Sequence, residues 1–177
     1  MNIPNALSLV RIFLVPVLVV FLIVVPRPDN LWAAAVFLAA VLTDWLDGRI
    51  ARSMRQVTTL GKLLDPVADK LLISASLISL VQVGRVPAWM VVLIVGRDLA
   101  ITGLRGIAAS QSVIIQANEF GKATMAAEVL AVALLILNWP AVAAPLGKAA
   151  LGVAILLSLV SGVAYFHKFW RRINLAK

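Results

Sequence analysis

Long apolar runs alternate with short polar breaks along the whole chain. A transmembrane helix needs about 20 predominantly apolar residues, and the chain divides into six runs of roughly that length. The breaks between them hold the proline, glycine and charged residues that typically end helices. The predicted spans cover residues 8–25, 31–50, 64–83, 87–108, 121–138 and 148–168. The sequence therefore predicts an all-α, polytopic membrane protein with six transmembrane helices.

Positive charge is unevenly divided between the two ends of these spans. An even number of spans puts both termini on one side, and the side with more Lys and Arg is usually cytosolic. The richer side carries Arg49, Arg52, Arg55, Lys62, Arg105, Lys122, Lys168, Arg171, Arg172 and Lys177. The other side carries only Arg27, Arg85 and Lys148. Both termini are therefore predicted to be cytosolic, in a multi-pass protein of the cytoplasmic (inner) membrane.

The composition narrows the classes of partner. Hydrophobic residues make up 62% of the 177 residues and charged residues 14%, with a net charge of +8. Such a balance fits anionic lipid surfaces and phosphate-bearing substrates. No nucleic acid partner is expected, because the basic residues are scattered between apolar runs. The absence of cysteine excludes disulfides and thiolate metal sites. We treat residues 1–177 as a single membrane domain.

Acidic residues gather near the predicted cytosolic ends of the spans. A charge at membrane depth is costly unless it is paired or hydrated, so such a grouping favours a functional site. After the second span, one helical arc of about 140° combines two carboxylates, one guanidinium and two very small residues. These residues are Asp44, Asp47, Gly48, Ala51 and Arg52. The small residues would let a ligand approach the backbone beside the carboxylates.

A second acidic stripe begins just before the third span. Gly61, Asp65 and Asp69 stand four residues apart, which places them on one face of a helix. Pro66 fits either the first turn of that helix or a kink within a helix that began earlier. Two such helices facing each other would close a cage of four carboxylates. Hard divalent cations prefer oxygen ligands of this kind, and four acids suit one or two metal ions.

The combined pattern from Asp44 to Asp69 resembles the signature of the CDP-alcohol phosphotransferase family. It reads Asp, two residues, Asp-Gly, two residues, Ala-Arg, eight residues, Gly, three residues, Asp, three residues, Asp. The resemblance implies that Asp44, Asp47, Asp65 and Asp69 bind Mg²⁺ or Mn²⁺, most simply as two ions. It also implies that Asp69 is the catalytic base and that Gly48, Arg52 and Thr58 contact the CDP part of the donor. Spacing alone leaves open whether Asp69 is a ligand, a base or both.

The rest of the chain resembles the branch of this family whose acceptor is sn-glycerol 3-phosphate. The shared segments are residues 2–5 with Arg11, residues 64–70, residues 96–98, residues 103–105 and residues 121–122. The resemblance implies CDP-diacylglycerol as donor, with phosphatidylglycerophosphate and CMP as products, and a homodimer among membrane lipids. The chain departs from the branch after Lys122. There the branch often has a second lysine, a threonine and a glutamine, whereas this chain continues as residues 123–128, ending in the acid Glu128.

An acceptor that already carries a phosphate needs cations near the metal cage. Arg97 and Arg105 stand eight residues apart, about 80° around a helix, so both can point into one cavity. Lys122 can join them from the start of the fifth span. Arginine suits a bidentate grip on phosphate, and lysine supplies a point charge. These three residues are the predicted acceptor-phosphate ligands, although a local ion pair between Arg97 and Asp98 is a competing interpretation.

Three other functions compete with this hypothesis. The first stays in the family but uses another acceptor, such as inositol phosphate or serine. The second is an intramembrane prenyltransferase, which also binds diphosphates with aspartates and Mg²⁺ but lacks the glycine and Ala-Arg positions found here. The third is a cation channel or transporter with acidic coordination. A channel or transporter predicts ion flux that survives Asp69→Asn, whereas the transferase hypothesis predicts loss of CMP release with the fold largely kept.

Overall fold

The computed structural model describes residues 3–25, 30–53, 59–110, 119–139 and 142–174. Short turns join the helices, and the regular secondary structure of this part of the chain is all helical. The helices are α1 (Ile3–Ile23), α2 (Leu31–Ser53), α3 (Thr59–Gln82), α4 (Ala88–Ser110), α5 (Glu119–Leu137) and α6 (Ala143–Asn174). The predicted all-α class and six helices are confirmed. Because α3 begins at Thr59, Pro66 lies within the helix and not in its first turn.

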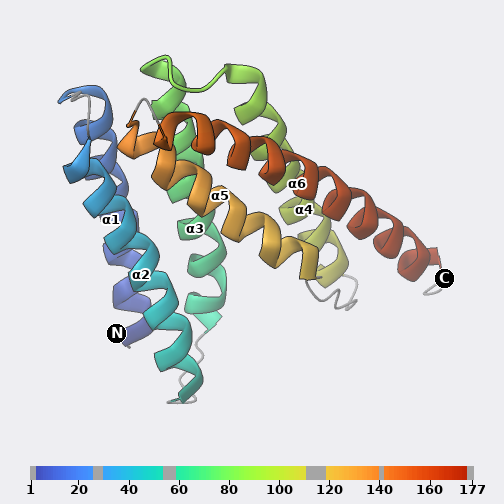
Figure 1. Cartoon of the computed structure of the whole chain (residues 1–177). Helices are drawn as coiled ribbons and strands as arrows, with labels where there is room; N and C mark the ends of the chain where they lie inside the picture. The colour runs from blue at the N-terminus through green and yellow to red at the C-terminus, as the bar shows by residue number, and fades with distance from the viewer. Residues whose placement is uncertain (1–2, 26–29, 54–58, 111–118, 140–141, 175–177) are drawn as a thin grey trace.

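The six helices form a bundle in which α3 lies between two groups (Figure 1). On one side α1 packs against both α2 and α3, and on the other α6 packs against α5 and α4. Helix α3 also contacts α4 and α5. This arrangement brings the middle of α3, with Asp69 and Lys70, close to α4 and α5, which carry the predicted acceptor residues.

Local signals in the sequence set the ends of the helices. Gly84 follows α3 with a φ of 71°, the left-handed conformation that glycine adopts without penalty. The Gly84 and Arg85 amides donate to the carbonyls of Val81 and Leu80, both at 2.9 Å, which is a Schellman motif. The Arg85 side chain then donates to the Ile136 carbonyl at 2.8 Å, near the end of α5. One short turn thus ends α3 and caps α5, where a cation also complements the helix dipole.

Most of the core is an aliphatic cluster to which all six helices contribute. Leu18, Phe37, Leu77, Leu135 and Leu151 are fully or almost fully buried in it. A smaller cluster pairs α4 with α6 through Ile101, Ala108, Tyr165 and Phe169. The two clusters fix α4, α5 and α6 relative to α3, and therefore fix the walls of the cavity described below.

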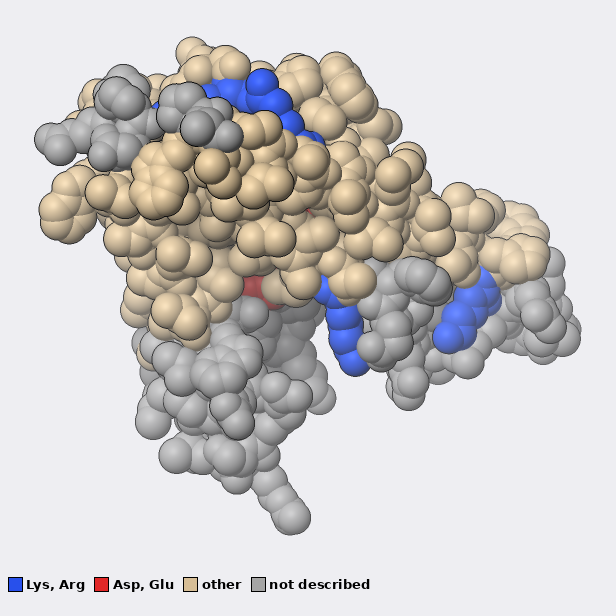
Figure 2. Space-filling view, in the orientation of Figure 1, with Lys and Arg blue, Asp and Glu red and all other residues tan. Residues whose placement is uncertain are grey.

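Large apolar side chains also cover much of the outer surface. Phe13, Val92 and Val163 are 72%, 68% and 71% exposed, on three different helices. Acidic and basic side chains take up little of the described surface on the face drawn in Figure 2. By length and composition, the segment Ala143–Trp170 could cross a membrane, and the segments Ser8–Ile23 and Leu31–Thr43 are shorter apolar helices. Outward-facing apolar surface of this kind is typical of a protein that meets lipid or a partner.

The close approach of α5 and α6 depends on Gly147. A Cβ at this position would lie 2.8 Å from Leu135 Cγ and 3.1 Å from the Leu135 backbone nitrogen. We therefore expect Gly147→Ala to lower the free energy of unfolding by about 1–3 kcal/mol, the usual cost of overpacking a core. Denaturant unfolding in detergent micelles would measure the loss.

Gly152→Ala is the matched control on the same helix. A Cβ there meets no heavy atom within 4 Å, while both alanines gain the same helix propensity. The difference between the two variants therefore reports the contact with Leu135. Equal stabilities would show that α5 can shift away from α6 without cost.

Candidate active site

A cavity of about 330 Å³ opens between α3, α4, α5 and α6. Its wall combines acids, cations and hydroxyl groups with a few apolar side chains. The polar members are Asp69, Lys70, Arg97, Asp98, Arg105, Lys122, Thr124, Glu128, Ser161 and Tyr165. The cavity therefore collects one predicted metal ligand, Asp69, and all three predicted acceptor-phosphate residues. A concave site in which charged groups converge is the usual form of a ligand pocket.

Asp69 stands in the cavity wall on α3 and is held by a cation from α1. Arg11 is completely buried, and its Nη1 donates to the Asp69 Oδ1. The Asp69 side chain keeps 27% of its surface accessible. A guanidinium that donates to a carboxylate fixes the direction of that carboxylate. Asp69 is therefore an oriented carboxylate in the cavity wall.

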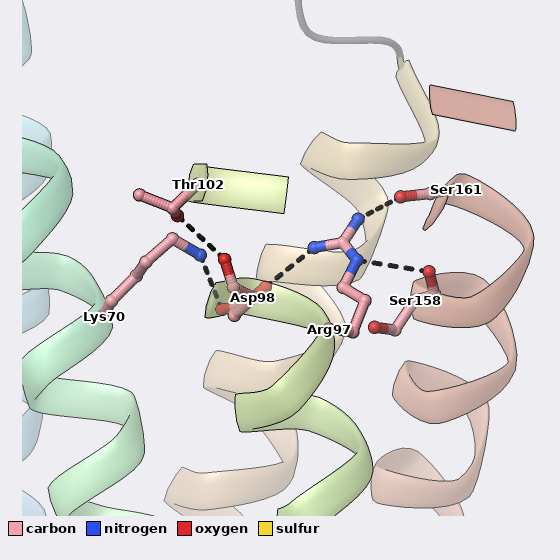
Figure 3. Close-up of polar contacts among 6 residues, drawn as sticks. All are labelled: Lys70, Arg97, Asp98, Thr102, Ser158 and Ser161. Carbon is pink, nitrogen blue, oxygen red and sulfur yellow. Dashed lines mark hydrogen bonds and ion pairs between the residues drawn. The ribbon is translucent and has the colours of Figure 1, made fainter. Parts of the chain in front are cut away.

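Asp98 on α4 is the centre of an ion-pair network shown in Figure 3. Its Oδ2 accepts from Lys70 Nζ on α3 at 2.7 Å, and its Oδ1 accepts from Arg97 Nη1 at 2.8 Å. The Thr102 hydroxyl donates to the Asp98 backbone carbonyl at 2.8 Å. Glu128 lies beside the same two cations, so this buried corner of the cavity combines two cations with two acids.

Arg97 joins this network to α6. Its Nε donates to the backbone carbonyl of Ser158 at 3.2 Å, and its Nη2 donates to the Ser161 hydroxyl. The local pair with Asp98, which competed with the phosphate-binding interpretation, is thus present. Arg97 still lines the cavity, so it can contribute charge to a ligand while its donors hold α4 against α6.

Arg105 occupies a different setting, two turns further along α4. Its guanidinium carbon lies 5.4 Å from the centroid of the Tyr165 ring on α6, a cation–π contact. The side chain is exposed and faces the same cavity. Lys122, on the first turn of α5, is also exposed there. Of the three predicted phosphate ligands, Arg105 and Lys122 are the two on the open side of the cavity.

The rest of the predicted site lies outside the described side chains. This holds for the metal ligands Asp44, Asp47 and Asp65 and for the CDP-binding residues Gly48, Arg52 and Thr58. The backbone of α3 is helical from Asp65 to Asp69, so these aspartates stand one turn apart as predicted. Within the described part of the chain, no three His, Cys, Asp or Glu side chains form a group that could hold a metal.

Several residues in the cavity wall or in contact with it had no assigned role in the sequence analysis. Arg11 was recognised only as part of a shared segment, yet a cation in an apolar run is itself a signal of a functional partner. Lys70, a cation in the predicted third span, carries the same signal. Ser161 and Tyr165 carry none, because their importance comes from packing between distant helices. Glu128 stood out as an acid within a predicted span, and the structure places it in the cavity wall.

Comparison with known proteins places the chain among the members of one family. The model of the CDP-alcohol phosphatidyltransferase family matches residues 1–163. The chain is 41% identical to the CDP-diacylglycerol–glycerol-3-phosphate 3-phosphatidyltransferase of Bacillus subtilis (strain 168), over 98% of this chain and 97% of that protein. It is 37% identical to the Arabidopsis thaliana CDP-diacylglycerol–glycerol-3-phosphate 3-phosphatidyltransferase 2, over 96% of this chain and 80% of that protein. It is 34% identical to the CDP-diacylglycerol–glycerol-3-phosphate 3-phosphatidyltransferase of Pseudomonas fluorescens, over 96% of this chain and 91% of that protein.

Proposed function

Because the chain belongs to the CDP-alcohol phosphatidyltransferase family, we propose that it transfers the phosphatidyl group of CDP-diacylglycerol to sn-glycerol 3-phosphate. The products are phosphatidylglycerophosphate and CMP. The chain is a phosphatidyltransferase, and relatives across nearly its whole length carry the name of this reaction. The observation that carries the proposal is the cavity in which the oriented Asp69 carboxylate faces a group of cations.

The cations fit an acceptor that already bears a phosphate. Arg105 and Lys122 stand on the open side of the cavity, and Lys70 and Arg97 add positive charge deeper in its wall. Charge-assisted hydrogen bonds from such groups bind a phosphate dianion in one orientation. The phosphate would then be anchored near α4 and α5, with the glycerol extending toward Asp69 on α3. This directs a hydroxyl of the acceptor at the catalytic carboxylate.

Asp69 is suited to take the proton of that hydroxyl. A base must lie within hydrogen-bond reach of the proton that it removes, and the cavity gives a ligand access to the exposed edge of Asp69. Arg11 donates to the Oδ1 of Asp69 and holds the carboxylate in place. The acceptor oxygen then attacks the phosphorus atom that bears the diacylglycerol, and the bond from that phosphorus to CMP breaks.

We also propose a metal site at the end of the cavity. Asp44, Asp47, Asp65 and Asp69 would hold Mg²⁺ or Mn²⁺, most simply two ions. The helical backbone that places Asp65 one turn before Asp69 fits this oxygen-rich set of ligands. Such ions neutralise the charge of a diphosphate and of the departing phosphate group. Gly48, Arg52 and Thr58 would contact the CDP part of the donor.

The proposed setting is the cytoplasmic (inner) membrane, crossed six times, with the active site facing the cytosol. The exposed apolar side chains on the helices and the length of Ala143–Trp170 support this placement. A lipid donor must enter sideways from the bilayer, whereas the charged acceptor and CMP exchange with water. A homodimer, implied by the resemblance to the family, is part of the same proposal, because exposed apolar faces can serve packing as well as lipid contact.

The acceptor assay tests the proposal directly. Purified protein receives CDP-diacylglycerol and Mg²⁺ with one acceptor at a time: sn-glycerol 3-phosphate, inositol phosphate or serine. We expect CMP release with sn-glycerol 3-phosphate alone. CMP release with another acceptor but not with this one would move the chain to a different branch of the family. Ion flux through proteoliposomes without CMP release in any reaction would instead favour a channel or transporter.

A further inference from the structure

Glu128 is the one acid of the cavity whose role the proposed mechanism leaves open. It lies within α5, and only 4% of its surface is accessible. Its side chain lines the cavity, and its Oε1 is buried without a hydrogen-bond partner among the described residues. A buried polar atom without a partner is costly, and native structures rarely keep one without a reason. Such an atom in a ligand cavity is ready to accept a hydrogen bond from the ligand.

The neighbours of Glu128 explain why no protein group satisfies it. Its carboxyl group interacts electrostatically with Asp98, Lys70 and Arg97. Both of these cations already donate to Asp98, and Arg97 also donates to Ser158 and Ser161 on α6. Asp98 therefore takes the close contacts with the cations, and Glu128 is left as a second acceptor beside them. The cavity thus offers donors for a phosphate and a separate acceptor for a hydroxyl.

The proposed acceptor substrate has the matching groups. sn-Glycerol 3-phosphate carries one phosphate, one primary hydroxyl that attacks the donor, and one secondary hydroxyl at C2. With the phosphate on the cations and the primary hydroxyl at Asp69, the C2 hydroxyl still needs an acceptor. We propose that Glu128 accepts a hydrogen bond from the C2 hydroxyl and thereby selects for it. This inference rests on the proposed function, and it makes Glu128 a specificity-determining residue.

The physical consequence is discrimination against an acceptor that lacks this hydroxyl. The matching analogue is 3-hydroxypropyl phosphate, which keeps the phosphate and the primary hydroxyl but has no C2 hydroxyl. With the analogue, the Glu128 Oε1 would stay buried and unpaired. Sites that hydrogen-bond a substrate hydroxyl reject analogues without it because a polar group of the site loses its partner. We expect wild type to favour sn-glycerol 3-phosphate by roughly 10- to 100-fold in kcat/KM, the usual cost of leaving a buried polar group without its hydrogen bond.

The test measures kcat/KM for both acceptors by CMP release from CDP-diacylglycerol, in wild type and in Glu128→Ala and Glu128→Gln. The ratio of the two values does not depend on the fraction of folded protein, because one preparation supplies both. In Glu128→Ala the ratio should fall to within about threefold of one, since the bond is then absent for both acceptors. In Glu128→Gln it should fall less than in Glu128→Ala, because the amide keeps one oxygen that can accept the same bond.

Ser76→Ala is the control. Ser76 is a fully buried residue of α3 whose hydroxyl donates to the Leu72 carbonyl at 2.7 Å, and it should keep the wild-type ratio. A wild-type ratio near one, or a wild-type ratio retained in both Glu128 variants, would overturn the role of Glu128. Wild type that releases no CMP with sn-glycerol 3-phosphate would instead refute the proposed function, so the two failures are distinguishable.

Discussion

Asp69→Asn is expected to lower kcat for CMP release by about 10³-fold or more. General base catalysis alone contributes roughly 10²- to 10⁴-fold, and an asparagine can neither accept the proton nor offer a second charged oxygen to a metal. The substitution keeps the size and shape of the side chain. Its amide oxygen can still accept from Arg11, the buried cation that holds Asp69 in the structure. The loss should therefore appear in kcat and much less in the folding of the bundle.

Two measurements separate this result from misfolding. Thermal unfolding in micelles should remain close to that of wild type, and CDP-diacylglycerol should still protect the variant against unfolding if the donor binds. A kcat for the variant within tenfold of wild type would show that Asp69 is not the general base. The variant also tests the channel or transporter hypothesis. That hypothesis predicts ion flux that survives Asp69→Asn, whereas the transferase predicts loss of CMP release.

The helices were predictable because a single signal determines them. Apolar runs long enough to span a bilayer, broken by proline, glycine and charge, predicted six helices. Gly84 ended α3 near its predicted limit because its left-handed conformation stops the helix there. The predicted third span began at residue 64, five residues after α3 begins at Thr59, because the polar segment before Asp65 gives no apolar signal. The spacing of Gly61, Asp65 and Asp69 nevertheless predicted a helix there, and the backbone is helical. Helix formation needs only backbone hydrogen bonds, whereas the sequence pattern reports burial.

The candidate site was predictable in part. Regular spacing on α4 placed Arg97 and Arg105 in one cavity, and the structure adds Lys122 from α5 as expected. Spacing could not foresee that Arg11, 58 residues before Asp69, reaches that carboxylate. It also could not assign Arg97 its bonds to α6, because these depend on how α4 and α6 pack. Contacts within one helix follow from periodicity, and contacts between helices follow from the fold.

The cavity cations differ in how many contacts they make within the protein, and this difference identifies the residue whose loss should most affect acceptor binding. Arg97 donates hydrogen bonds to Asp98, Ser158 and Ser161. Its removal would therefore disturb the packing of α4 on α6 as well as the binding of a ligand. Arg105 is exposed, and its guanidinium group lies over the Tyr165 ring, a contact that uses none of its N–H donors in a hydrogen bond. A guanidinium that stacks on an aromatic ring keeps its planar set of donors for a phosphate. Arg105 is therefore the cleanest probe of acceptor binding.

Arg105→Ala is expected to raise the KM for sn-glycerol 3-phosphate by roughly 10- to 100-fold, which corresponds to one or two charge-assisted hydrogen bonds. The KM for CDP-diacylglycerol should stay nearly constant, because the donor is proposed to bind through residues of α2 and of the segment that follows it. Arg105→Lys should recover only part of the loss, since lysine restores the charge without the planar pair of donors. Titrating each substrate while the other is saturating measures both constants.

Arg85→Ala is the matched control for this experiment. It removes the same side chain from the turn between α3 and α4, where Arg85 caps α5 and is not part of the cavity wall. We expect it to reduce stability while leaving both KM values close to those of wild type. If Arg105→Ala leaves both KM values unchanged, Arg105 does not bind the acceptor, and its charge serves the orientation of the protein in the membrane. If it raises both together, the residue shapes the whole cavity, and the phosphate must be held by Lys122 and Lys70.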